Sequence, residues 1–197
     1  MRSVLRWSAV PLVVAALGVG LLTGCVPEAP VEPGLTGPNP SGDPTGQPAP
    51  TISATPVSTP VDATCDELLS PQAVYDFNPN FGLLDSYSPS EGSVAASAIA
   101  YQGVACRWQN QTSGDNIDVS VAELDDDTLT ALKNAAFDQS EMVPTYGEEA
   151  YFTLGGNGVG TAIVFQGPYW IVVESPAFRE PGDATPIVES VIAGLDA

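Results

Sequence analysis

The 197-residue sequence contains no histidine, and only five of its residues are lysine or arginine. Without histidine, the chain cannot form a Ser-His-Asp or Cys-His nucleophile system, or a zinc site with an imidazole ligand. Against the five basic residues stand 24 acidic ones, which give a formal net charge of −19. A surface of this charge repels phosphate backbones, so we expect no nucleic acid among the partners.

Carboxylates are therefore the most numerous acid–base groups of the chain. Two of them can act as acid and base in hydrolysis. They cluster densely only at Glu148-Glu149 and at Asp125, Asp126 and Asp127. The three aspartates lack the spaced pattern of a calcium loop and precede an apolar helical pattern, so we interpret them as a helix N-cap. We expect no catalytic residue, no metal site and no cofactor.

Cysteine is also scarce, and Cys25, the first of three, follows an N-terminus of the secretory kind. Two arginines precede an apolar run over residues 10–22, which is the layout of a signal peptide. The run ends in Leu22-Thr23-Gly24-Cys25, which resembles the lipobox of bacterial lipoproteins, where the cysteine sulfur takes a diacylglyceryl group and the chain is cut just before it. The alternative is an uncleaved membrane anchor, because residues 4–22 approach the length that spans a bilayer.

We therefore predict a lipoprotein signal peptide over residues 1–24 and a lipid on Cys25 that holds the protein on the outer face of the cell membrane. Cleavage removes Arg2 and Arg6, which leaves three basic residues against 24 acidic ones, a formal charge of −21. An anionic membrane surface repels such a chain. Attachment must then come from the lipid chains, and stable anchoring takes two or more of them.

Residues 26–62 are rich in proline, glycine, serine and threonine and contain no aromatic residue. This composition cannot bury enough apolar surface to offset the entropy of the chain, so it predicts a disordered linker. The linker and the lipid-bearing Cys25 make up residues 25–62, and the remaining residues, 63–197, are long enough for one folded domain.

Within that domain Cys65 and Cys106 form an even pair in an oxidising location, and we predict a disulfide between them. Cys106 falls on the apolar side of a strand pattern and Cys65 in a first helical turn, which lets them meet. Two buried free thiols are the alternative.

Periodicity predicts the elements of the domain. Helices are expected over residues 65–69, with Asp62 or Thr64 as cap, over residues 71–77, with Ser70 as N-cap, from Ser90 or Ser93 to about residue 100, and over residues 126–139 and 183–195. Strands are expected over residues 104–109, 117–121, 150–154, 160–166 and 169–174. Residues 156–160 join two of these strands and open no helix, so we interpret this glycine-rich stretch as a hairpin and not as a phosphate loop. Short links make the strands antiparallel, and the order predicts an α+β domain in which helices cover one face of a sheet of about five strands.

Three short motifs of the domain resemble those of actinobacterial surface lipoproteins that share a disulfide-stapled α+β domain of unknown function. They are Cys65-Asp66-Glu67-Leu68-Leu69, Cys106-Arg107-Trp108 and Gly147-Glu148-Glu149-Ala150. A fainter resemblance is to the extracellular sensor domains of bacterial receptor kinases. The resemblance implies an extracytoplasmic lipoprotein with a cystine, and it carries over no catalytic residue.

The last strands lack a polar face, because apolar side chains occupy both sides of them. If helices cover one face only, either residues 81–87 cross the second face or an apolar patch is exposed there. That patch would consist of Tyr151, Val164, Trp170 and Val172. Such a patch marks a site for a partner or a ligand.

From these patterns we expect a non-enzymatic binding module for a protein, an envelope component or a small apolar ligand. A sensory or accessory domain is the first alternative, and a carboxylate-dependent hydrolase is the second. Two convergent carboxylates in a cleft would favour the hydrolase.

Overall fold

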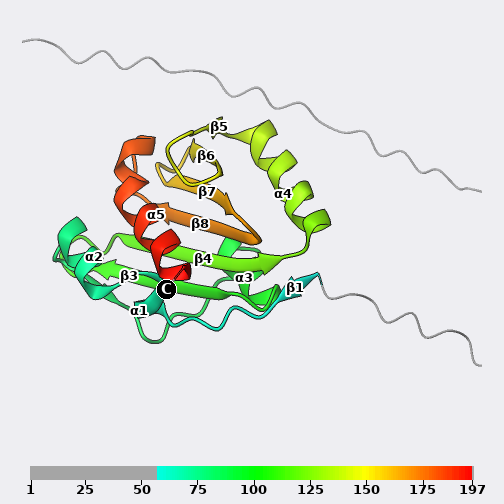
Figure 1. The fold of residues 1–197 in the computed structure, drawn as a ribbon. Coiled ribbons are helices and arrows are strands. Elements are labelled where there is room, and N and C mark those ends of the chain that lie inside the picture. The colour runs from blue at the N-terminus through cyan, green and yellow to red at the C-terminus, as the bar shows by residue number, and fades with distance from the viewer. Residues whose placement is uncertain (1–56, 197) are drawn as a thin grey trace, which may run out of the picture. The chain divides into compact units, whose positions relative to one another are not determined.

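An open antiparallel sheet of eight strands runs through residues 57–196, the portion of the chain that the computed structural model describes (Figure 1). The strands are β1 (Ser58–Thr59), β2 (Phe81–Leu83), β3 (Val104–Asn110), β4 (Asn116–Leu124), β5 (Glu141–Met142), β6 (Glu149–Leu154), β7 (Gly160–Gln166) and β8 (Tyr169–Ser175). Their order is β2-β3-β4-β8-β7-β6-β5, and β1 pairs with the end of β4. The α+β class and the antiparallel pairing are therefore confirmed.

The prediction of about five strands is wrong, because it found only the five long ones. The three missed strands have two or three residues each, which is too short to show a period of two. One of them, β1, lies inside the predicted linker, where Ser58 pairs with Leu124 and Thr59 with Glu123. The ordered chain thus begins before residue 63, while Cys25 and residues 26–56 lie outside the described residues.

Three helices cover the first face of the sheet: α1 (Cys65–Leu68), α2 (Pro71–Phe77) and α5 (Pro181–Leu195). Figure 1 looks onto this face, with α5 crossing in front of the strands. Ile187, Val188 and Val191 of α5 are fully buried against the apolar side chains that β3, β4, β7 and β8 present. This is the larger of two cores.

The second face has helices of its own, α3 (Val94–Ala100) and α4 (Asp126–Gln139). Ala98 of α3 packs with Ala122, and Leu129 and Ala136 of α4 belong to the same apolar cluster. The prediction that helices cover one face is therefore wrong. It failed because α3 is made of small residues that approach the sheet closely, and because β7 and β8 are apolar on both sides, as strands buried on both faces are.

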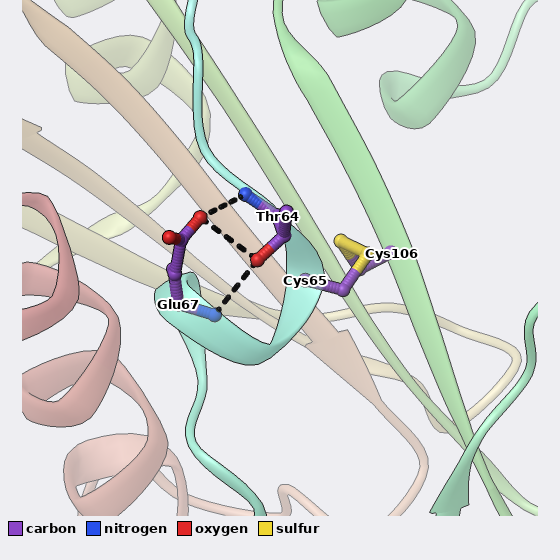
Figure 2. Close-up of a disulfide and its surroundings, with 4 residues drawn as sticks. All are labelled: Thr64, Cys65, Glu67 and Cys106. Atoms are coloured by element: carbon purple, nitrogen blue, oxygen red, sulfur yellow. Dashed lines mark hydrogen bonds between the residues drawn. A yellow bond between two sulfur atoms is a disulfide. The ribbon is translucent and has the colours of Figure 1, made fainter.

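The predicted starts of α1, α2 and α4 are confirmed by their caps, whereas α5 begins at Pro181, two residues before the predicted start. Thr64 and Glu67 form a capping box at α1, in which the Thr64 side chain accepts from the Glu67 amide and the Glu67 carboxylate accepts from the Thr64 amide (Figure 2). Ser70 caps α2 ahead of Pro71, and Asp125 caps α4. These side chains satisfy amides that the first helical turn leaves without a partner.

The disulfide joins α1 to β3. Cys65 and Cys106 are bonded, with their Cα atoms 5.7 Å apart, as Figure 2 shows. The predicted pairing is confirmed. A helix of four residues is not stable alone, so the bond and the fully buried Leu68 and Leu69 hold α1 on the sheet.

The contact between α5 and α1 depends on Gly194. A Cβ atom added there would lie 2.7 Å from the backbone oxygen of Leu68, closer than real Cβ atoms approach. We therefore expect Gly194→Ala to lower the free energy of unfolding by about 1–3 kcal/mol, although alanine favours a helix.

Gly182, in the first turn of the same helix, is the matched control because nothing lies within 4 Å of its added Cβ. Gly182→Ala should leave stability unchanged or raise it slightly in urea unfolding. Equal effects of the two substitutions would contradict the close packing of α5 on α1.

Candidate functional site

The second face of the sheet divides into an apolar region under α3 and α4 and a polar region beyond them. In the polar region, four neighbouring strands each contribute a side chain to a row. The row consists of Arg107 on β3, Asp118 on β4, Glu174 on β8 and Thr161 on β7, each the cross-strand partner of the next. Because side chains of direct partners project to the same face, register alone brings these four together.

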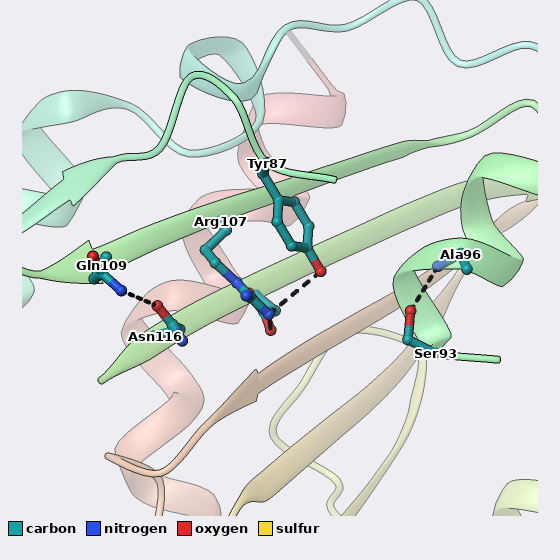
Figure 3. A network of polar contacts seen from close by, with 7 residues as sticks. Tyr87, Ser93, Ala96, Arg107, Gln109 and Asn116 are labelled. Carbon is teal, nitrogen blue, oxygen red and sulfur yellow. Dashed lines mark hydrogen bonds and ion pairs between the residues drawn. The ribbon is translucent and has the colours of Figure 1, made fainter. Parts of the chain in front are cut away.

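Arg107 and Asp118 form a two-pronged ion pair. Nε of Arg107 lies 2.5 Å from Oδ1 of Asp118, and Nη2 lies 2.6 Å from Oδ2. The Tyr87 ring stacks on the guanidinium at 4.2 Å, and Figure 3 shows this ring lying over Arg107. These contacts fix Arg107 in position, and Asp118 neutralises its charge.

No basic side chain of residues 57–196 forms an ion pair of this kind with Glu174. Its Oε1 accepts a hydrogen bond of 3.3 Å from the Thr161 hydroxyl, and its neighbour in the row is the carboxylate of Asp118. Burial raises the pKa of Glu174 above its ordinary value, and the Asp118 charge adds to the rise, while Thr161 and Arg107 oppose it. A half-buried carboxylate with this environment costs stability when it is ionised.

A cavity of about 390 Å³ opens over the row. Its wall includes Arg107, Asp118 and Glu174, together with amide side chains at Asn116 and Asn157. Asn116 accepts from the Gln109 side chain at 3.3 Å, beside Arg107 in Figure 3. The volume falls within the ~300–1,000 Å³ of small-molecule sites, so this polar cavity, defined by these five residues, is the candidate site.

The predicted apolar patch is not a surface. Tyr151, Trp170 and Val172 belong to the core under α3 and α4, and Val164 belongs to the opposite core beneath α5. All four are buried: Trp170 is 7% exposed, Tyr151 and Val172 are each 2% exposed, and Val164 is not exposed at all. The two helices cover the second face here, and Tyr87, from residues 81–87, lies on Arg107 in the polar region of that face.

The two acidic clusters serve the fold. Asp125 accepts a hydrogen bond of 2.8 Å from the Thr128 amide, which confirms the predicted N-cap. Hydrogen bonding with Thr128 lowers the pKa of Asp125. Glu148 accepts from the Gly167 amide at 3.1 Å. Glu149 lies 3.0 Å from Lys133, so the lysine is paired.

Residues 156–160 form the β6–β7 hairpin, as expected, with Gly158 at a φ of 81°. The hairpin still contributes to the site, because Asn157 lies in the wall of the polar cavity.

Within residues 57–196 no three histidine, cysteine or acidic side chains gather in a way that could hold a metal ion. Over the same residues no helix has the length and apolarity to span a bilayer. A second cavity, of about 460 Å³, lies between residues 60–63, α1 and the end of α5. Its wall includes Glu67, whose carboxylate is already used in the α1 capping box.

Glu174 should make stability depend on pH. Its native pKa exceeds its unfolded value, so its contribution to stability is present below about pH 4 and is lost as the pH rises through the native pKa. We expect Glu174→Gln to have a higher melting temperature than the natural protein at pH 7.5, with the difference shrinking toward pH 4.

Glu189→Gln, at an exposed position of α5, removes the same charge and is the control for general repulsion. Differential scanning calorimetry at both pH values should show a larger gain for Glu174→Gln than for the control. A gain of the same size in both variants would show that burial does not raise the pKa of Glu174.

Comparison with known proteins gives no relative for this chain: no protein-family model, no curated protein and no solved structure matches it.

Proposed function

We propose that the protein is an extracytoplasmic lipoprotein, anchored through lipid on Cys25, whose folded domain binds an envelope component in the polar cavity without transforming it. The single observation that carries the binding role is the position of Glu174. Its partly buried carboxylate lies in a cavity wall, and no basic side chain among residues 57–196 forms an ion pair with it. Residues that lower stability in a cleft are typical of functional sites.

The burial of Trp170 and its neighbours removes the support for a small apolar ligand, and the polar wall favours a polar one. The folded domain as a whole is acidic, since Arg107, Lys133 and Arg179 are its only basic residues. An acidic surface speeds the approach of positively charged partners and slows that of anions.

Capture from cell envelopes tests the binding role. A fragment of residues 51–197 contains every described strand and helix, and its immobilised form should retain the same envelope component in repeated preparations. Asn116→Trp puts an indole into the cavity and should abolish retention, while Glu189→Trp on exposed α5 should not. Equal retention by both variants would refute the cavity as the binding site.

The anchor has its own test. Cys25→Ser removes the sulfur that would carry lipid, so we expect the variant to lose the acyl mass from its N-terminal peptide and to leave the detergent phase in Triton X-114 partitioning. If the natural protein carries an unmodified thiol at Cys25 in the membrane fraction, the lipoprotein assignment is wrong and an uncleaved anchor replaces it.

A carboxylate-dependent hydrolase is the second candidate, because Asp118 and Glu174 face one cavity. A carboxyl group with a raised pKa suits a general acid. Both oxygens of Asp118, however, accept from Arg107, which weakens it as a base. Turnover of an envelope glycan that Asp118→Asn and Glu174→Gln each abolish would favour the hydrolase over the binding module.

A further inference from the structure

We propose that the polar cavity recognises a primary ammonium group on a small polar molecule, and that Glu174 is the residue that pairs with it. This inference rests on the binding role proposed above and names the chemistry of the ligand. The cavity wall holds three carboxylates, those of Asp115, Asp118 and Glu174, against the single guanidinium of Arg107.

The geometry determines which of these charges is available. Arg107 directs two N–H groups at Asp118 and carries the Tyr87 ring on its face, so it is not free to receive an anion. Asp115 accepts from the Ser113 hydroxyl at 2.8 Å in the β3–β4 turn. Glu174 keeps one weak neutral partner, the Thr161 hydroxyl at 3.3 Å.

A cation placed beside Glu174 would supply the missing charge. A carboxylate that is partly removed from water gains more from an ion pair than an exposed one does. An ammonium group has three N–H donors. Asp118 and Asn116 lie in the same wall, and their oxygens, which each accept one hydrogen bond already, have a second lone pair to accept from it. The volume of about 390 Å³ leaves room for a small organic cation.

Two sources offer such a group, an amino sugar and a lysine side chain. The test uses glucosamine and Nα-acetyl-lysine amide as probes, with N-acetylglucosamine and the diacetylated lysine amide as counterparts in which acetylation removes the charge. Binding to the ¹⁵N-labelled fragment of residues 51–197 is followed by shifts of the amide signals of Asn116, Asp118 and Glu174.

We expect at least one ammonium probe to shift these signals. Its neutral counterpart should bind at least about tenfold more weakly. Glu174→Gln should weaken binding of the ammonium probe by a similar factor, while Glu189→Gln should not. This comparison distinguishes binding in the cavity from diffuse attraction to an acidic surface. The probe that binds identifies the source.

Two results would overturn the inference: neutral counterparts that bind as tightly as the ammonium probes, or cavity signals that no ammonium probe shifts. In either case the binding role still stands if envelope capture depends on Asn116. If Asn116→Trp leaves capture unchanged while glucosamine binds through Glu174, the ligand class holds and the envelope partner does not use the cavity.

Discussion

Replacing both Cys65 and Cys106 with alanine is expected to lower the free energy of unfolding by about 4 kcal/mol. The bond closes a loop with a sequence separation of 41 residues, and the estimate follows from the entropy that this loop restores to the unfolded chain. The same bond holds α1, whose four residues cannot form a stable helix alone. Urea unfolding of the double variant measures the loss.

The reducing agent dithiothreitol supplies the control for this experiment. It should bring the natural protein close to the stability of the double variant and leave the double variant unchanged. A loss below about 1 kcal/mol would mean that the reduced chain keeps α1 on the sheet through packing of Leu68 and Leu69 alone.

Trp170→Ala is expected to destabilise the domain by about 3 kcal/mol or more, because it empties a site in the core under α3 and α4. The indole is 7% exposed and meets the Tyr101 ring edge-on, with centroids 6.3 Å apart. Thermal unfolding should show the loss directly. Trp170 thus supports the fold, whereas an exposed patch would have made it a contact for a partner.

Phe137→Ala is the matched aromatic control on the same face of the molecule. Phe137 lies on α4 and is 64% exposed, so its truncation should change stability by no more than about 0.5 kcal/mol. If Trp170→Ala were as mild as Phe137→Ala, the packing of the second core would be wrong and an exposed Trp170 would be considered again.

Local patterns predict most of the fold. Caps at Thr64, Ser70 and Asp125 and the alternation in the five long strands can be recognised because each depends on neighbours in sequence. The placement of α3 and α4 on the second face cannot be recognised, because periodicity predicts a helix but not the face of the sheet on which it packs. The sequence shows that both sides of β7 and β8 are apolar. On its own this pattern suggests an exposed patch, whereas in the structure the side chains on the second face are buried under α3 and α4.

The candidate site could not be found in the same way. Asp118 and Glu174 lie 56 positions apart, and only the antiparallel register of β4 with β8 makes them neighbours. A search for dense acidic clusters leads instead to Asp125 and Glu148, which bind backbone amides. One signal is present: Glu174 is the only charged residue in the otherwise largely apolar strand β8.

The most direct test of a binding site in the polar region of the second face is hydrogen–deuterium exchange of residues 51–197 with and without envelope extract. We predict slower exchange in the β3–β4 turn and the β6–β7 hairpin, which border the cavity at Asp115 and Asn157, and no change in α5 on the opposite face. Protection that falls on α5, or none anywhere, would contradict it.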